Sequence, residues 1–313
     1  MKILITGGLG FIGSHLSELL VEDKHTIILL TKNFSKKSNI TKISNRVKIE
    51  KVDVTNYTKL SDAIERHKPN VIIHLAGTTS HSKSFEKPFD DIDQNAKSTL
   101  FILEKLRHMN HKCRVILGST FIVVGKPLKI PINEKTSCWP TTLYGTNRLA
   151  SEHYCKIYNE VYDLDTVTFR ITNSFGPREQ VLSTKNAINF LMHEAFKGNT
   201  ITIFKKGKFF RDLIYISDVI SGIKTIVNKG KSGDLYWISS GKKTWFYQLG
   251  ELLEQLTEAK VKFVKTPKYT KKVDVGNFVV SNSKLKSLGW KPKVNLNAGI
   301  EKTLEYFKLH KIS

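Results

Sequence analysis

The chain has 313 residues, with 50 Lys or Arg against 28 Asp or Glu, which gives a net charge of +22 at pH 7. Its 40 % hydrophobic and 25 % charged residues are typical of a globular protein and exclude wholesale disorder and collagen-like repeats. No apolar run approaches the ~18 residues of a membrane-spanning helix, and the first residues do not read as a signal peptide. With three cysteines at unrelated spacings, we expect a cytoplasmic protein with reduced thiols, no metal site and an attraction to anions.

Short apolar runs alternate with helical patterns along the first half of the chain. The strands are too continuously apolar for a half-exposed sheet, so helices should cover both faces. This alternation predicts an α/β fold of the Rossmann type, in which helices flank a doubly wound parallel sheet. We expect strands at residues 3–6, 26–30, 47–52, 71–75, 115–117 and 166–170, and helices at residues 11–22, 57–67 and 98–108.

The alternation loosens beyond about residue 173, where prolines and basic connections separate shorter elements. We therefore expect residues 1–172 to form the Rossmann domain and residues 173–313 to form a smaller C-terminal lobe. Part of the segment 206–240 should return to the first domain.

A glycine-rich turn follows the first expected strand and opens the first helix, with the sequence TGGLGFIG from Thr6 to Gly13. Its glycines permit a tight turn, close approach of a pyrophosphate to backbone N–H groups and close packing of helix on strand. The N-terminus of the helix then faces the anion with its partial positive charge. The alternative is a purely structural turn. Because a strand precedes the segment and a helix follows it, the sequence predicts dinucleotide binding by Gly7, Gly10, Phe11, Ile12 and Gly13.

The end of the second strand bears on which dinucleotide is bound. A carboxylate there usually accepts from the ribose 2′-hydroxyl of NAD, but this chain has Thr31 and Lys32. A hydroxyl and a cation suit the 2′-phosphate of NADP better. NADP(H) is therefore the expected cofactor, with NAD(H) as the alternative. Asp53 and Val54, which end the third strand, are expected near the adenine.

A second group of polar residues has the types needed for acid–base chemistry. Tyr144 and Arg148 lie four residues apart at the start of a helical pattern, so both project from one helix face. A fixed cation near a phenol favours the phenolate, which suits general acid–base work. Thr120, just after the fifth strand, is placed to hydrogen-bond a substrate hydroxyl or carbonyl.

At this point the sequence resembles the extended short-chain dehydrogenase/reductase family, in particular its branch of nucleotide-sugar epimerases and dehydratases. The resemblance covers nearly the whole chain and implies a homodimer that passes hydride between a nicotinamide and a nucleotide-diphosphate sugar. It is carried by segments 6–13, 53–54, 74–77, 84–88 with Asn95, 119–125, 144–148, 173–178, 211–215 and 288–292.

The resemblance also implies roles for single residues. Thr120, Tyr144 and Arg148 would form the catalytic triad, although the family has Lys in the position of Arg148, and the two cations are not interchangeable. For Arg211, implied to bind the diphosphate, the alternative is a salt bridge to Asp212 or Asp218. Cofactor contacts are also implied for Leu75, Ala76 and Gly77. Sugar-nucleotide contacts are implied for Thr79, Ser119, Thr120, Asn173, Arg211, Lys271 and Asp274.

The residues after Thr120 narrow the reaction. Family dehydratases have an acid pair there, and epimerases acting at C3 or C5 commonly have a Cys, whereas this chain has Phe121 and Ile122. Neither side chain transfers protons. The remaining chemistry is hydride transfer at one carbon, which we expect to be C4 of the sugar. Both a 4-epimerase and a 4-ketoreductase carry out this chemistry, and the sequence does not decide between them.

A competing hypothesis uses the positive charge. The chain would be a catalytically impaired family member, marked by Arg148, that binds nucleic acid or another anion through residues 32–51 and 262–272. However, Phe34 is the one aromatic residue within 32–51, and both Thr120 and Tyr144 are present. Nucleic acid is therefore the less favoured partner.

Overall fold

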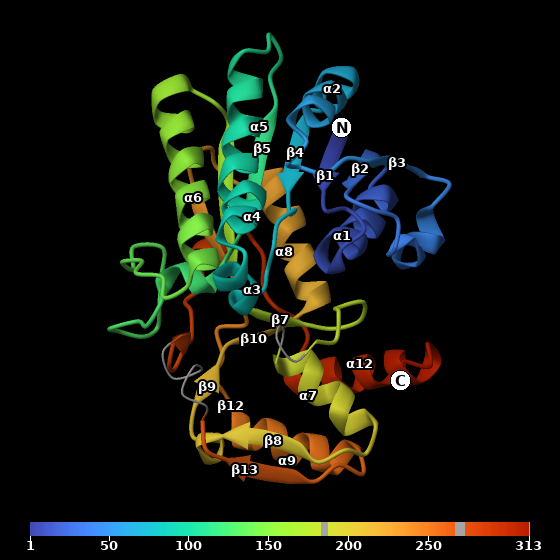
Figure 1. Cartoon of the computed structure of the whole chain (residues 1–313), viewed down its shortest axis with the longest axis vertical. Helices are drawn as coiled ribbons and strands as arrows, with labels where there is room; N and C mark the ends of the chain where they lie inside the picture. The colour runs from blue at the N-terminus through green and yellow to red at the C-terminus, as the bar shows by residue number, and fades with distance from the viewer. Residues whose placement is uncertain (183–186, 267–272, 313) are drawn as a thin grey trace.

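The computed structural model describes residues 1–182, 187–266 and 273–312, and its centre is a seven-stranded parallel sheet (Figure 1). The strand order β11-β6-β5-β4-β1-β2-β3 places β4 beside β1, where the direction of chain progress across the sheet reverses. All six expected strands are present, and the Rossmann-type fold is confirmed. The strands are β1 (Lys2–Thr6), β2 (Thr26–Thr31), β3 (Val47–Lys51), β4 (Val71–His74), β5 (Arg114–Thr120), β6 (Thr166–Ile171) and β11 (Leu235–Ile238).

Long helices cover both faces of the sheet. They are α1 (Phe11–Glu22), α2 (Tyr57–His67), α5 (Ser98–Arg107), α6 (Leu143–Tyr162) and α8 (Ile216–Lys229). Because successive residues of a strand point to opposite faces, β1 contributes to two separate cores. Ile3 and Ile5 pack with Leu16 of α1 and Ile223 of α8. Leu4, between them, packs on the other face with residues of α2, α5 and α6.

Short helical segments connect the longer elements near the carboxyl ends of the strands. Both α3 and α4 pack beside α6, close to the lower end of the sheet in Figure 1. These segments are η1 (Lys37–Ile43), α3 (His81–Glu86), α4 (Pro88–Ile92), η2 (Asp93–Lys97) and η3 (Phe121–Val124).

The chain leaves the sheet after β6 and builds a smaller lobe beyond its carboxyl edge (Figure 1). Between β10 and β12 it returns to the sheet, because α8 packs on α1 and β11 pairs with β6. The strands of the lobe pair two by two: β7 (Asn173–Phe175) with β10 (Leu213–Tyr215), β8 (Ile201–Phe204) with β13 (Val261–Val264), and β9 (Phe210–Arg211) with β12 (Thr244–Trp245). Its helical segments are α7 (Ala187–Phe196), η4 (Lys205–Gly207), α9 (Phe246–Leu256), α11 (Ser283–Lys286) and α12 (Leu296–Leu309).

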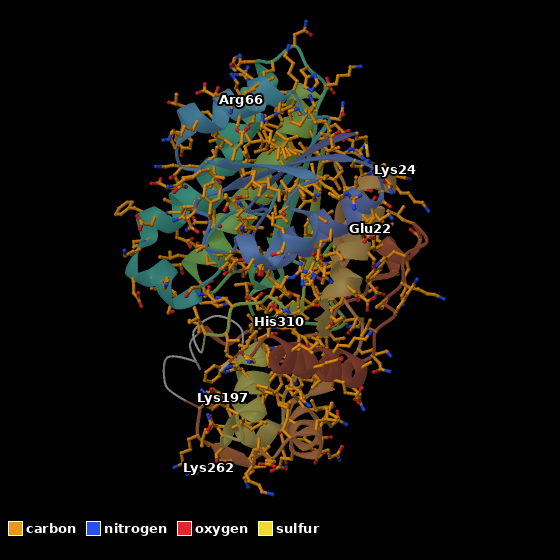
Figure 2. The ribbon with its side chains drawn as sticks, turned by 90° about the vertical axis from the view of Figure 1, so that its right-hand side faces the viewer. Glu22, Lys24, Arg66, Lys197, Lys262 and His310 are labelled. Carbon is orange, nitrogen blue, oxygen red and sulfur yellow. The ribbon has the colours of Figure 1, made fainter. Side chains whose placement is uncertain are left out.

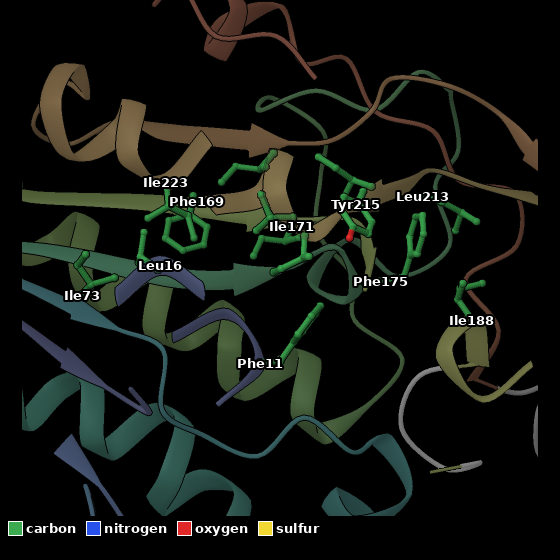
Figure 3. Packing of buried hydrophobic residues seen from close by; sticks show 14 of the residues in the cluster. Phe11, Leu16, Ile73, Phe169, Ile171, Phe175, Ile188, Leu213, Tyr215 and Ile223 are labelled. Carbon is green, nitrogen blue, oxygen red and sulfur yellow. The ribbon is translucent and has the colours of Figure 1, made fainter. Parts of the chain in front are cut away.

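One apolar cluster continues from the sheet into the smaller lobe. Figure 3 shows Leu16 and Phe169 at the sheet and, farther along, Phe175, Tyr215 and Leu213 where the lobe begins. The rings of Phe175 and Tyr215 meet edge to face, with centroids 5.6 Å apart. The lobe is therefore joined to the sheet by a shared core.

A buried carboxylate ties together three segments at this junction. Asp212 is fully buried and accepts hydrogen bonds through both of its oxygens. Oδ1 accepts from the Ser240 N–H at 2.9 Å, from the Ser240 hydroxyl at 2.8 Å and from the Thr172 hydroxyl at 3.3 Å. Oδ2 accepts from the N–H groups of Gly241 at 3.1 Å and Val280 at 3.2 Å. This set of donors fixes the geometry of the chain next to Arg211.

The excess positive charge is spread over the surface of the molecule. Figure 2 shows Arg66 at one end, Lys24 toward the same end, and Lys197 and Lys262 at the far end of the smaller lobe, and all four side chains are exposed. Basic residues therefore lie at both ends of the molecule.

Candidate active site

A cleft of about 930 Å³ lies between the carboxyl edge of the sheet and the smaller lobe. Ligands of open α/β sheets bind at this edge, where the strand order reverses. Every residue that the sequence assigned to the site and that the structure describes lines this cleft. Lys271 lies outside the described residues.

The glycine-rich turn forms the wall of the cleft beside β1. Gly7 has a φ of 69°, which favours glycine, and its N–H donates to the Leu30 carbonyl at 2.9 Å. A Cβ on Gly13 would lie 2.5 Å from the Gly7 carbonyl oxygen, so α1 begins too close to the turn for a side chain there. Among the described residues, no side chain caps α1 at Gly10. The first N–H groups of α1 are therefore available to an anion.

The end of β2 carries a cation that is already paired. The Lys32 ammonium lies 3.1 Å from Asp53 Oδ2, and the Thr31 hydroxyl donates to the Asn33 carbonyl at 2.7 Å. Burial raises the pKa of Asp53, but hydrogen bonds from Thr55 and Lys32 outweigh it, and the pKa is lowered overall. Asp53 is therefore held as a carboxylate whose charge Lys32 offsets.

Thr120 and Tyr144 face the cleft from β5 and α6. The Thr142 hydroxyl caps α6 by accepting from the Gly145 N–H at 3.1 Å, which fixes the helix start where Tyr144 lies. Thr120 Oγ1 accepts from the Ile122 N–H at 3.3 Å. Tyr144 is 6 % exposed, and no described residue hydrogen-bonds its hydroxyl. The Tyr144 hydroxyl is therefore available to hydrogen-bond a ligand in the cleft.

Arg148 lies one turn farther along α6 and is anchored to the sheet. The side chain is 3 % exposed; its Nη1 donates to the Gly118 carbonyl and its Nη2 to the Ala76 carbonyl, both at 3.2 Å. Its Nε and the Asn95 Oδ1 are buried without a hydrogen-bond partner in the described ranges. A Cβ on Gly77 would lie 2.2 Å from that Asn95 oxygen and 2.5 Å from Arg148 Nη2. The side chains of Asn95 and Arg148, each with one unpaired polar atom, thus pack closely against Gly77 at the cleft.

The positions after Thr120 are apolar in their surroundings as well as in their chemistry. The Phe121 ring meets the Phe278 ring edge to face at 5.0 Å, and Ile122 is buried in the same cluster. These two positions therefore give the site neither an acid nor a base.

The residues implied for the sugar nucleotide line the opposite wall. Arg211 Nη2 lies 2.7 Å from Asp274 Oδ1, and Lys205 pairs with the other Asp274 oxygen at 2.7 Å. Arg211 does form a salt bridge, but the partner is Asp274, whereas the sequence suggested Asp212 or Asp218. Asp212 is instead occupied by donors at the lobe junction, and Asp218 accepts from two backbone N–H groups.

Ser119 and Asn173 both line the cleft, but they differ in whether the side chain already has a hydrogen-bond partner. The Ser119 hydroxyl donates to Glu152, whose carboxylate pairs with Arg170 at 2.6 Å inside the protein. This hydroxyl therefore already has an acceptor, and Ser119 ties β5 to α6. In contrast, Asn173 Oδ1 is buried with no partner among the described residues, so it is free to accept from a ligand.

Several polar residues of the cleft were not predicted from the sequence, among them Ser35, Lys36 and His81. Lys36 belongs to the basic stretch 32–51, so its proximity to Thr31 could have suggested it. No sequence pattern marks His81, because only the packing of α3 on α6 brings it to the cleft.

None of the helices in residues 1–182, 187–266 and 273–312 has both the length and the apolar character to cross a bilayer. Within the same ranges, no group of three or more His, Cys, Asp or Glu side chains is arranged to hold a metal ion.

Comparison with known sequences gives matches along almost the full chain. A family model described as GDP-mannose 4,6 dehydratase matches residues 4–303. A protein of Methanocaldococcus jannaschii named putative UDP-glucose 4-epimerase is 28 % identical over 308 residues, which covers 98 % of both chains. A dTDP-D-glucose 4,6-dehydratase of Bos taurus is 29 % identical over 321 residues, covering 98 % of this chain and 88 % of that protein.

Solved structures of similar proteins match the fold along almost the full chain as well. The UDP-glucose 4-epimerase of Thermotoga maritima, solved with UDP-glucose, superimposes with a TM-score of 0.91 at 27 % identity and covers 99 % of this chain and 100 % of its own. The UDP-glucuronic acid 4-epimerase of Bacillus cereus, in complex with UDP-glucuronic acid and NAD, has a TM-score of 0.88 at 26 % identity, with coverage of 99 % and 100 %.

Proposed function

Because this chain belongs to the extended short-chain dehydrogenase/reductase family of nucleotide-sugar epimerases and dehydratases, we propose that it transfers hydride at C4 of a nucleotide-linked sugar. The observation that carries the proposal is that the glycine-rich turn, Tyr144 and Arg211 line one cleft. This cleft thus combines a dinucleotide-binding turn, an acid–base residue and a cation for a diphosphate.

The cleft fits a nicotinamide dinucleotide on the evidence of its unpaired groups. The uncapped start of α1 suits a diphosphate, and the unpaired Arg148 Nε and Asn95 Oδ1 suit ribose hydroxyls. Residues of the turn, with Thr31, Lys32 and Asp53, would hold the rest of the molecule. When bound there, the nicotinamide supplies the hydride donor or acceptor.

The residues of the chain supply the proton chemistry. Tyr144 takes the proton of the sugar hydroxyl as the carbon is oxidised and returns it when the carbon is reduced. Thr120 hydrogen-bonds the same oxygen from the end of β5. Arg148 places a fixed positive charge one helix turn from Tyr144, although a guanidinium cannot itself pass on a proton.

The opposite wall of the cleft suits the nucleotide. The guanidinium of Arg211 suits a diphosphate, which would take the place of Asp274 at Nη2, while Nη1 donates to the carbonyls of Phe210 and Gly276 in this structure. Asn173, with its free oxygen, and Asp274 would accept from sugar and ribose hydroxyls. We assign Lys271 to the diphosphate on the resemblance of its segment alone.

The apolar residues after Thr120 support a reaction confined to C4. A 4,6-dehydratase needs an acid and a base to remove water, and the packing of Phe121 and Ile122 offers neither. A 4-epimerase needs only Tyr144 and hydride return, and three of the similar proteins described above are named 4-epimerases. A 4-ketoreductase is the second candidate, favoured by Thr31 and Lys32, because net reduction consumes a cofactor that is supplied as NADPH.

The two candidate reactions are separated by their need for added cofactor. We expect purified protein, incubated with UDP-glucose and UDP-galactose in turn, to interconvert them if it is a 4-epimerase. Conversion without added cofactor excludes the ketoreductase. Oxidation of added NADPH by 4-keto sugar nucleotides, without interconversion, excludes the epimerase. Failure of both reactions and of UDP-sugar binding would refute the proposed function.

We propose NADP(H) as the preferred cofactor because the end of β2 carries no carboxylate. The nearest acid, Asp53, is paired with Lys32, and Lys36 adds a second cation to the cleft lining. Fluorescence titration with NADPH and NADH tests this preference. Lys32→Ala should weaken NADPH binding more than NADH binding, whereas Lys24→Ala, on the surface away from the cleft, should change neither. Equal affinities for the two cofactors in the unmodified protein would contradict the preference.

We also propose a homodimer formed through α5 and α6, which pack side by side (Figure 1). On α6, Ile157 is 48 % and Val161 is 62 % exposed, although both are apolar and lie one turn apart. Light scattering after size exclusion should give twice the chain mass. Val161→Glu should give monomers, and Lys156→Glu, on the same helix, should remain dimeric. A monomeric unmodified protein would refute the interface.

A further inference from the structure

From the structure we infer that His81 binds a hydroxyl of the substrate sugar near the reacting carbon, as a neutral hydrogen-bonding group beside Tyr144. The inference rests on the proposed function, since it needs a sugar at Tyr144. His81 is the first residue of α3 and lines the cleft. Its ring meets the Tyr144 ring edge to face, with centroids 5.7 Å apart and an interplanar angle of 89°. The imidazole therefore lies next to the residue that handles the C4 proton.

The ring nitrogens of His81 are available to a ligand. Throughout residues 1–182, 187–266 and 273–312, neither nitrogen has a hydrogen-bond partner, and neither is sealed away from the cleft. Burial lowers the pKa of His81, and the nearby Asp91 carboxylate only partly opposes this. At neutral pH the ring is therefore uncharged, with one nitrogen that donates and one that accepts. A sugar hydroxyl, which both donates and accepts, matches such a group.

The backbone that carries His81 is fixed relative to α6. Asp91 of α4 is 1 % exposed; its Oδ1 accepts from Asn147 Nδ2 at 2.7 Å, and its Oδ2 accepts from the Thr78 hydroxyl. Asn147 lies on α6 between Tyr144 and Arg148, so Asp91 connects the α3–α4 segment to the helix of the reacting phenol. The Ser80 hydroxyl also caps α3 by accepting from the Lys83 N–H at 3.3 Å. His81 is thus held in position before substrate arrives, which reduces the entropic cost of the contact.

The position of His81 identifies which hydroxyls it serves. Tyr144 acts at C4, so a ring in contact with the phenol adjoins the substituents of the neighbouring carbons. The hydroxyls on C3 and C6 are the candidates, whereas the nucleotide lies at the opposite wall with Arg211. His81 should therefore affect the sugar and leave the nucleotide unaffected.

Binding and turnover of UDP-glucose, UDP and two deoxy analogues test the inference. His81→Phe keeps an aromatic ring against Tyr144 but removes both nitrogens, and His81→Asn keeps a donor and an acceptor. We expect His81→Phe to lower kcat/KM for UDP-glucose by about 10-fold or more, with unchanged affinity for UDP, and His81→Asn to recover part of the loss. The exposed His310 gives the control, His310→Phe, which should behave like the unmodified protein.

The deoxy analogues separate a contact with the sugar from a structural role. For UDP-3-deoxyglucose or UDP-6-deoxyglucose, whichever lacks the contacted hydroxyl, unmodified protein and His81→Phe should have equal kcat/KM. The inference is wrong if His81→Phe loses the same factor on both analogues, if it weakens UDP binding, or if it leaves kcat/KM for UDP-glucose within twofold. If the unmodified protein binds neither UDP-glucose nor dTDP-glucose, the proposed function fails and this inference fails with it.

Discussion

Arg148 allows a quantitative test, because its side chain makes two separate hydrogen bonds to the backbone. The guanidinium sends separate nitrogens to the carbonyls of Gly118 and Ala76, each at 3.2 Å. A lysine ammonium carries its three N–H donors on one nitrogen and lacks the two separate nitrogens of the guanidinium, so we expect it to lose one of these bonds. A hydrogen bond from a charged donor contributes about 1.5–3 kcal/mol. Arg148→Lys should therefore lower the free energy of unfolding by about 2 kcal/mol.

Urea unfolding at 25 °C measures this loss, and a second arginine serves as the control. Arg114, at the start of β5, likewise donates to an acceptor pair, Asp165 Oδ2 at 2.7 Å and the Gly230 carbonyl at 3.1 Å. Its side chain is 24 % exposed, so water can replace a lost bond. Arg114→Lys should therefore cost less than about 1 kcal/mol. The activity of Arg148→Lys should stay within about 10-fold of the unmodified enzyme, because the charge is retained.

Arg148→Met separates the charge from the packing. It keeps an unbranched side chain but removes the fixed cation that borders the cleft one turn from Tyr144, so kcat should fall at least 10-fold. The reasoning is refuted if Arg148→Lys is as stable as the unmodified protein, or if Arg148→Met keeps full activity. A large rise in rate for Arg148→Lys would show that the arginine impairs catalysis.

Three other substitutions test separate parts of the structure. Gly13→Ala places a methyl group 2.5 Å from the Gly7 carbonyl oxygen, so it should weaken NADPH binding at least 10-fold in a fluorescence titration. Asp212→Asn should lower the free energy of unfolding by about 2–4 kcal/mol, because both carboxylate oxygens accept from backbone N–H groups and an amide nitrogen cannot. Burial lowers the pKa of His15 from 6.5 to about 4, so its neutral form is favoured in the folded state. The stability from this shift is fully present above pH 6.5 and is lost as pH falls toward 4, by about 3 kcal/mol in all; His15→Gln should flatten the urea-measured pH dependence in that window.

Much of the fold was determined by the sequence alone, because the relevant signals are local. Continuous apolar runs such as β4 and glycines at the start of α1 depend on residues a few positions apart, so their pattern is visible in one dimension. The separation of four residues between Tyr144 and Arg148 likewise predicts that both lie on one face of α6. The apolar identity of Phe121 by itself predicts that this position supplies neither an acid nor a base.

The tertiary structure decided which groups meet, since partners far apart in sequence leave no local pattern. Arg211 pairs with Asp274, 63 positions away, although Asp212 is its neighbour in the chain. Similarly, His81 reaches Tyr144 only because α3 packs on α6. Side chains acquire such partners when the chain closes loops between distant segments, and the competition among several nearby acids or rings is settled by distance and burial in the folded state.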